Sequence, residues 1–191
     1  MNNMKIKKAF EICKKQGVIR IYRNDNEEQY LSDGAAIYPI FELPNLNEDY
    51  ICRLYDITDA QRGKIAFDII KGMPGVDVSD SAADETPAEM WDISLSYNGA
   101  IIIPIATDEG TMFINQLYLK PFTDMPQNDM QITKRVCGNM RYFCIKFGML
   151  AYGFIAPMSI VTKDFVAKLE KLYNQSKIIL INQRSSDDET V

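Results

Sequence analysis

The sequence predicts an α+β fold built from antiparallel sheets and a few helices. Three observations predict it: short runs in which apolar and polar residues alternate, Asp-Gly and Asn-Gly pairs between such runs, and stretches of helical spacing towards both ends of the chain. The chain has 191 residues, of which 47% are hydrophobic and 25% charged, as is typical of globular domains. A chain of this length buries roughly 70% of its unfolded surface.

The predicted helices are marked by apolar spacing and by capping residues. Residues 4–16 place Ile6 and Phe10 on one stripe, with lysines on the other side, and Gly17 is suited to the left-handed backbone that ends a helix. Two further helices are expected, one over 59–71 after the capping box that begins at Thr58, closed by Gly72, and one over 162–175 capped by Thr162.

The strands are predicted from alternation and from turn signals. Residues 29–40 form a hairpin around Asp33-Gly34, and residues 91–105 form a second hairpin around Asn98-Gly99. The remaining predictions are strands over 111–114, 130–136, 141–146, 150–157 and 177–182, and a short helix over 115–122 that ends near Pro121.

Composition changes along the chain predict its organisation. Residues 73–89 are acidic and contain Pro74, Gly75 and Pro87, so they form either a linker or a long surface loop. We therefore expect an N-terminal α+β half over 1–72, a strand-rich half over 90–182 and a disordered acidic tail over 183–191.

Two of the predicted strands repeat one pattern. Residues 33–40 (DGAAIYPI) and 98–105 (NGAIIIPI) both read [DN]-G-A-x-I-x-P-I. The pattern is typical of a tight turn followed by an alternating strand and then by a proline that stops ladder pairing. It is consistent with a duplication that relates the two halves, and also with two unrelated hairpins that converged on the same pattern.

The residue inventory excludes several kinds of site. The chain has no histidine, which removes Ser-His-Asp and Cys-His nucleophiles and most zinc sites. No glycine-rich nucleotide loop is present, so no cofactor and no metal is predicted. The four cysteines Cys13, Cys52, Cys137 and Cys144 form no C-x-x-C pair, and we interpret them as small core residues. The basic N-terminus leads into no apolar segment, which favours a cytoplasmic protein without a membrane span.

Charge is distributed unevenly around a net value of −5. Residues 72–119 contain 8 acidic residues and no lysine or arginine, whereas residues 120–191 have a small basic excess. This balance argues against a protein that coats nucleic acid over its whole surface. It leaves open binding through a single basic face.

One segment resembles the DNA sliding-clamp family. Residues 113–122 (FINQLYLKPF) are similar to the clamp segment in which a strand enters a helix, and the meander over 130–158 ends in IAPM, as the closing strands of a clamp domain do. The resemblance covers roughly residues 91–160, with weaker support from 4–40. The chain also resembles proteins of phages and mobile elements of Gram-positive anaerobes.

The clamp resemblance implies a non-enzymatic accessory of DNA replication. Family members form rings of related domains, with sheets outside and with lysine-bearing helices that face DNA phosphates. The resemblance therefore implies a homo-oligomer with duplex DNA and a replication protein as partners, and no small-molecule substrate. The lysines that would contact DNA are Lys7, Lys8, Lys14 and Lys15 in the first helix and Lys163, Lys168 and Lys171 in the last. The alternative for each lysine is a solubilising helix face.

Two other functions remain open. The protein could be a small interaction module of a mobile element, binding a partner through the acidic region over 77–109. Catalysis is the function that the sequence favours least. Without histidine it would have to use carboxylates such as the pairs Asp84-Glu85 and Asp108-Glu109, which lie in polar, turn-like segments.

Overall fold

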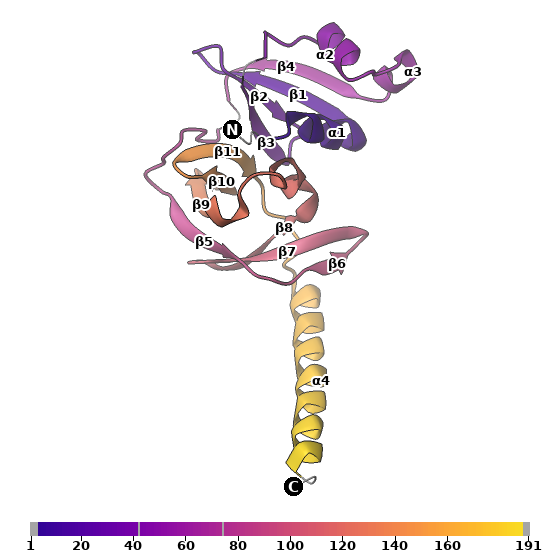
Figure 1. Ribbon diagram of the computed structural model, residues 1–191, viewed down its shortest axis with the longest axis vertical. Coiled ribbons are helices and arrows are strands. Elements are labelled where there is room, and N and C mark those ends of the chain that lie inside the picture. Colours follow the sequence, from indigo (N-terminus) through magenta and orange to yellow (C-terminus); the bar gives the residue numbers. More distant parts are fainter. Residues whose placement is uncertain (1–3, 42, 74, 189–191) are drawn as a thin grey trace. The chain divides into compact units, whose positions relative to one another are not determined.

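The computed structural model describes residues 4–41, 43–73 and 75–188 (Figure 1). The chain divides into two compact units, Met1–Pro157 and Met158–Val191. The first unit contains the sheet and the short helices, and the second contains one long helix. The expected boundary at 73–89 falls within the first unit, and the interpretation of these residues as a link between two halves stays a prediction.

The first unit is built on a mixed sheet of 11 strands in the order β4-β1-β2-β3-β11-β10-β9-β5-β7-β6, with β8 paired to β7. The strands are β1 (Val18–Arg23), β2 (Gln29–Ser32), β3 (Ala36–Ile40), β4 (Ala66–Lys71), β5 (Thr86–Met90), β6 (Leu95–Tyr97), β7 (Ala100–Thr107), β8 (Gly110–Asn115), β9 (Met130–Cys137), β10 (Met140–Phe147) and β11 (Leu150–Ile155). Their pairing is antiparallel, apart from the parallel pair β1 and β4. The predicted α+β class is confirmed.

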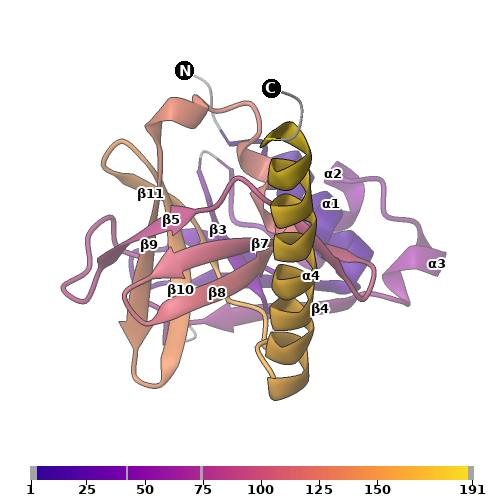
Figure 2. The ribbon, with the colours of Figure 1, turned by 90° about the horizontal axis from the view of Figure 1, so that it is seen from below.

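Strand β5 joins two parts of this sheet. Its residues Thr86 to Ala88 pair with β9, and Glu89 and Met90 pair with β7. Figure 2 shows β7 and β8 side by side, running across the direction of β9 and β10. A strand that leaves one ladder and enters the next makes a corner of this kind.

The repeated hairpin pattern forms β3 and β7, each directly after its turn. Asn98 and Gly99 both have positive φ, 48° and 78°, as a two-residue hairpin turn requires. The expectation that proline stops pairing holds on one side of β7 only. Pro104 lies between the segments that pair with β6 and with β5, whereas the ladder with β8 continues past it to Thr107.

The helices of the first unit are short. They are α1 (Ile6–Gln16), α2 (Glu48–Leu54), α3 (Asp59–Arg62) and the 3-10 helices η1 (Gln116–Phe122) and η2 (Gln127–Asp129). Helix α1 matches its prediction closely. It buries Ala9, Phe10, Ile12 and Cys13, and Gly17 adopts the left-handed conformation at φ 73°.

The helix predicted over 59–71 is wrong after its first turn. The capping box is present, since Thr58 and Gln61 exchange hydrogen bonds, but α3 ends at Arg62. The chain then forms β4, which pairs with β1 along all six residues from Ala66 to Lys71. A neighbouring strand that offers a complete ladder outweighs a local helix signal, and the adjacent Ile69 and Ile70 favour a strand.

The strand predicted over 177–182 is also wrong. Helix α4 (Lys163–Asp188) continues through these residues and through 183–188, where a disordered tail is expected. The end of that tail, residues 189–191, lies outside the described residues. No glycine or proline interrupts the sequence between Lys163 and Asp188, so the isoleucines over 178–181 continue a helix that is already nucleated.

The core of the first unit joins η1 to the centre of the sheet. The hydroxyl of Tyr38 donates a hydrogen bond of 3.0 Å to the carbonyl of Tyr118, and the ring of Phe122 contacts the rings of Tyr38 and Phe147. Gly153 on β11 leaves the space that Phe122 fills, because a Cβ at this position would lie 2.6 Å from the tip of that ring.

We expect Gly153→Ala to lower the free energy of unfolding by about 1–3 kcal/mol, because the added methyl forces the buried Phe122 ring out of its site. Gly63→Ala is the matched control. Its backbone has φ −64°, and the new Cβ would make an ordinary contact at 3.8 Å. Urea unfolding followed by circular dichroism measures both. Equal stability of the two variants would contradict this account of the core.

Candidate nucleic-acid interface

The structure places the seven predicted lysines on two helices. Lys7, Lys8, Lys14 and Lys15 lie on the side of α1 that faces away from its buried residues. Lys163, Lys168 and Lys171 are exposed on α4, in the second unit. The lysines therefore form one group on each unit.

Two of the seven lysines have partners within the chain. The Nζ of Lys8 donates to the Oγ1 of Thr123 at 2.6 Å and lies 3.9 Å from Asp124. The Nζ of Lys168 donates to Asp164 at 2.7 Å, one helical turn away. Within the described part of the chain, the side chains of Lys7, Lys14 and Lys15 form no ion pair. These three remain available for a ligand.

A pocket of about 370 Å³ lies beside the C-terminal end of α1. Two lysines and four amide side chains contribute to its lining: Lys15, Gln16, Asn98, Asn115, Gln116 and Lys120. We call these six residues the lysine–amide pocket. None of the described residues that line it carries a carboxylate, although the chain has a net charge of −5.

Three separate segments bring the lysine–amide pocket together. Lys15 and Gln16 end α1, Asn98 lies in the turn between β6 and β7, and the other residues lie where β8 enters η1. Asn115 caps η1, since its Oδ1 accepts a hydrogen bond of 2.9 Å from the N–H of Leu117. This cap fixes the start of the turn that carries Lys120.

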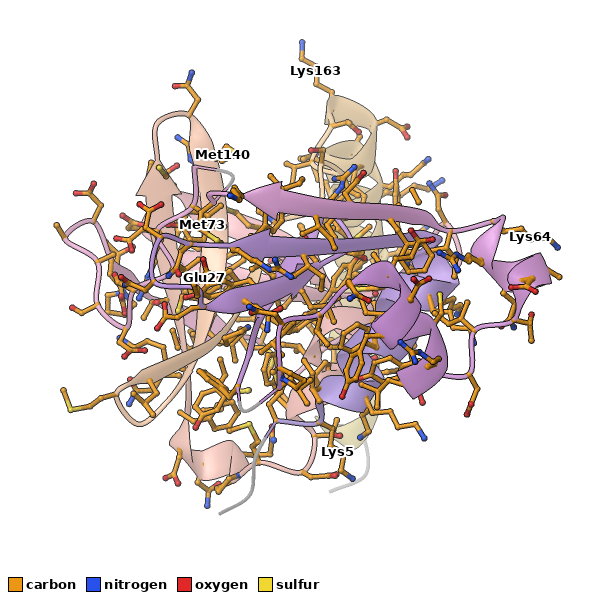
Figure 3. The ribbon with its side chains drawn as sticks, turned by 90° about the horizontal axis from the view of Figure 1, so that it is seen from above. Lys5, Glu27, Lys64, Met73, Met140 and Lys163 are labelled. Atoms are coloured by element: carbon orange, nitrogen blue, oxygen red, sulfur yellow. The ribbon has the colours of Figure 1, made fainter. Side chains whose placement is uncertain are left out.

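The pocket suits an oxyanion on chemical grounds. Ammonium groups supply charge without base specificity, and side-chain amides donate hydrogen bonds to phosphate oxygens. Lys64 lies in the connection between α3 and β4, where its side chain points outward (Figure 3). Its carbonyl oxygen would lie 3.4 Å from a Cβ at Gly17, so its backbone lies against the same end of α1.

A second pocket lies against α1 and has a different character. It measures about 400 Å³ and is lined by Lys7 and Lys14 together with Glu11 and Asp56. The rings of Phe10 and Tyr55, both lining residues, stack with centroids 4.1 Å apart. Carboxylates offset the two lysines here, so this pocket is less suited to an anion than the lysine–amide pocket.

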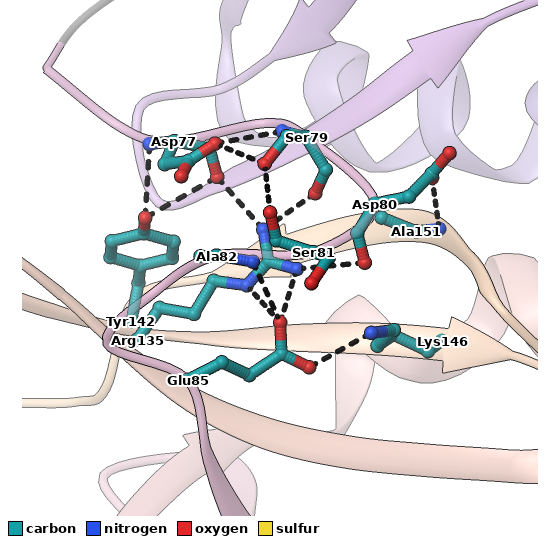
Figure 4. A network of polar contacts seen from close by, with 10 residues as sticks. All are labelled: Asp77, Ser79, Asp80, Ser81, Ala82, Glu85, Arg135, Tyr142, Lys146 and Ala151. Carbon is teal, nitrogen blue, oxygen red and sulfur yellow. Dashed lines mark hydrogen bonds and ion pairs between the residues drawn. The ribbon is translucent and has the colours of Figure 1, made fainter.

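Several arginine and lysine side chains elsewhere in the first unit make contacts within the fold, as Figure 4 shows for Arg135. This side chain is completely buried. Its five N–H groups donate to the carbonyls of Asp77, Ser79 and Asp80 and twice to the carboxylate of Glu85. A guanidinium has five donors, so all of them are satisfied.

The acidic segment from Asp77 to Glu85 is therefore anchored to the sheet. The second oxygen of Glu85 accepts a hydrogen bond of 2.9 Å from Lys146. Burial would raise the pKa of the Glu85 carboxyl, but the hydrogen bonds from Lys146 and Arg135 outweigh it and hold the pKa below its usual value. The hydroxyl of Tyr142 accepts from the N–H of Asp77 at 2.9 Å and fixes the start of the segment.

The carboxylates at the turn between β7 and β8 are also engaged. The buried Nζ of Lys134 lies 2.6 Å from both Asp108 and Glu109, and Arg141 contacts Glu109 as well. Burial would lower the pKa of Lys134, but these two carboxylates raise it above its usual value. Three acidic residues of the region over 77–109, Glu85, Asp108 and Glu109, thus form ion pairs within the chain, and the role of this region as a binding surface stays a prediction.

The cysteines are free, and Cys13, Cys52 and Cys144 are buried. Burial raises the pKa of the Cys144 thiol to about 12. Within the described residues, no three histidine, cysteine or acidic side chains are grouped closely enough to hold a metal ion. Of the helices in the same part of the chain, none combines the length and the apolar character needed to cross a membrane.

Comparison with protein-family models, with curated protein sequences and with solved structures finds no match for this chain. The resemblance to sliding clamps therefore stays a prediction. Lys15 is the one pocket residue among the seven predicted lysines, and Gln16, Asn98, Asn115, Gln116 and Lys120 were not predicted to bind. The available signal was the segment over 113–122, which supplies three of the pocket residues.

We expect Arg135→Met to lower the free energy of unfolding by about 3–5 kcal/mol, because it takes the guanidinium away from the Glu85 carboxylate and leaves the carbonyls of Ser79 and Asp80 without a donor. Arg141→Met is the matched control, because it makes the same substitution at an exposed ion pair with Glu109. It should lower the free energy of unfolding by less than about 1 kcal/mol. Chemical unfolding at neutral pH measures both variants. Similar losses would show that the Arg135 network does not hold the segment.

The lowered pKa of Glu85 predicts a dependence of stability on pH. A carboxyl whose folded pKa is depressed stabilises the protein above its unfolded pKa of about 4.3, and this contribution is lost as the pH falls through the folded pKa. Glu85→Gln removes that contribution, so its unfolding free energy should fall less steeply than the wild type between about pH 5 and pH 2. Parallel curves for the two proteins would contradict this prediction.

Proposed function

We propose that the protein binds the phosphate backbone of DNA through the lysine–amide pocket and the neighbouring lysines of α1, and that it acts by binding rather than by catalysis. The observation that carries this proposal is the composition of the pocket. Two lysines and four amides line it without a carboxylate, in a chain whose net charge is −5.

The contrast with four cations elsewhere in the first unit supports the proposal. Arg20, Arg62, Lys134 and Arg135 each contact a carboxylate within the chain. Lys15 and Lys120 form no ion pair in the part of the chain that is described. An ammonium without a partner carboxylate can replace the counterions of a phosphate without breaking a contact in the protein, and the release of those counterions drives association.

The contacts that the pocket offers are of the kind that position a protein on DNA without reading its sequence. Lysine and amide side chains contact phosphate and sugar, which are the same at every base pair. We therefore infer binding without sequence preference. Together with the resemblance to sliding clamps, this makes an accessory of DNA replication, of phage or mobile-element origin, the more specific form of the proposal.

Lysines near the C-terminal end of a helix have a structural use as well. They interact favourably with the helix dipole and keep the surface soluble. This alternative explains Lys14 and Lys15 at the end of α1. It does not explain Lys120, Asn98, Asn115 and Gln116, which come from other elements of the fold.

Replacement of Lys120 by glutamate is the direct test. We expect Lys120→Glu to weaken binding of a labelled duplex roughly eightfold at about 0.1 M salt and to reduce the slope of log K against log salt by about 0.9, the effect of one lost phosphate contact. Fluorescence anisotropy over a salt series measures both quantities, and circular dichroism checks that the variant is folded.

Lys71→Glu is the matched control, because Lys71 is exposed, forms no ion pair among the described residues and lies on β4 outside the pocket. It changes the net charge by the same amount and should leave the salt slope unchanged. The double variant Lys163→Glu, Lys171→Glu tests the lysines of α4 separately. Equal weakening by Lys71→Glu and Lys120→Glu, or no binding by the wild type, would overturn the proposal.

A further inference from the structure

Helix α4 carries a seven-residue repeat of apolar side chains. Val166, Tyr173 and Leu180 lie seven residues apart, with Leu169 and Ser176 at the intermediate positions. This alternation of three and four residues is the spacing of positions a and d in a coiled coil. A repeat of seven residues makes helices wind around each other with a left-handed twist.

The apolar side chains of this repeat are half exposed. The exposed fractions are 49% for Val166, 63% for Tyr173 and 58% for Leu180, and the neighbouring Leu172 and Ile179 are exposed to 55% and 59%. The described part of the second unit contains α4 as its single helix. Helices in proteins owe most of their stability to the packing of such a face.

The charged residues beside the repeat favour one orientation of a second copy of the helix. Glu170 and Lys177 both occupy position e, and Leu172 and Ile179 both occupy position g. In a parallel pair of identical helices, position g of one helix faces position e of the other, so Leu172 would lie beside Lys177 of the second copy. In an antiparallel pair, Glu170 lies beside Lys177 of the second copy, and the two-fold symmetry forms this pair twice.

The sizes of the core residues agree with the same arrangement. In the antiparallel register, Tyr173 of one helix faces Ser176 of the other, and Leu169 faces Leu180. A large residue thus meets a small one, and two leucines meet each other, as well-packed layers require. At the same time Leu172 lies beside Ile179 of the second copy.

We propose that α4 forms an antiparallel two-helix coiled coil with α4 of a second copy of this chain. The proposal rests on the repeat, on the complementary charges of Glu170 and Lys177 and on the sizes of the facing residues. It is independent of DNA binding, which is assigned to the first unit.

Molar mass of the full chain, measured by sedimentation over a range of concentrations, tests the dimer. We expect Leu172→Asp to weaken the dimer at least tenfold, because it places a charge in the apolar seam. Ile178→Asp is the matched control. Ile178 is exposed to 57% but lies on the opposite side of α4, so the dimer should be unchanged.

Charge reversal tests the orientation. Glu170→Lys alone places like charges beside each other twice and should weaken the dimer several-fold, whereas Glu170→Lys combined with Lys177→Glu should restore it. In a parallel dimer these residues do not face each other, and the double variant would not recover.

Two results would overturn the proposal. A wild-type protein that stays monomeric at all concentrations would show that α4 does not pair with α4 of a second copy. A dimer that Leu172→Asp and Ile178→Asp affect equally would show that the interface lies elsewhere. Circular dichroism of each variant confirms that α4 is still helical.

Discussion

The buried guanidinium of Arg135 is the interaction on which the arrangement of the first unit depends. It satisfies all five of its donors on one short acidic segment, from Asp77 to Glu85. A buried charge without these partners would cost several kcal/mol. The segment therefore follows one path over the sheet, and β5 enters between β9 and β7 at a defined register. The corner between the two parts of the sheet follows from this register.

Internal ion pairs, in this network and at the turn between β7 and β8, engage several carboxylates of this acidic protein. Glu85, Asp108 and Glu109 are neutralised by Lys146, Arg135 and Lys134 on the neighbouring strands. The negative potential of these carboxylates is thereby weakened at a distance, because the opposite charges of an ion pair largely cancel there. Lys15 and Lys120 lie among amides instead. The protein thus uses one group of cations to hold its loops and leaves another group for a ligand.

Local signals in the sequence predict much of the fold. The turns Asp33-Gly34 and Asn98-Gly99 mark two hairpins, and Gly17 marks the end of α1, because each needs a backbone conformation that few residues adopt. The errors at β4 and at the end of α4 have a common cause. Both are segments rich in isoleucine, whose structure depends on what lies beside them.

The candidate site is less accessible to sequence reasoning than the fold. The spacing of the lysines on α1 indicates a basic face, and this prediction depends only on the periodicity of a single helix. The lysine–amide pocket is formed by three segments that are distant in sequence. The side chains of Asn98 and Gln116 can be recognised as part of a site only when the turn between β6 and β7 and the start of η1 are known to lie beside α1. Which lysines have partner carboxylates is likewise a property of the tertiary structure.

The side-chain amide resonances of the pocket report most directly on the central claim, that the lysine–amide pocket is the place where a polyanion binds. In a titration of the isotope-labelled protein with a short DNA duplex, followed by NMR, the account predicts shifts of the NH₂ signals of Gln16, Asn98, Asn115 and Gln116 that saturate together and disappear at high salt. Shifts confined to α4 or to the segment held by Arg135, or no shifts, would contradict it.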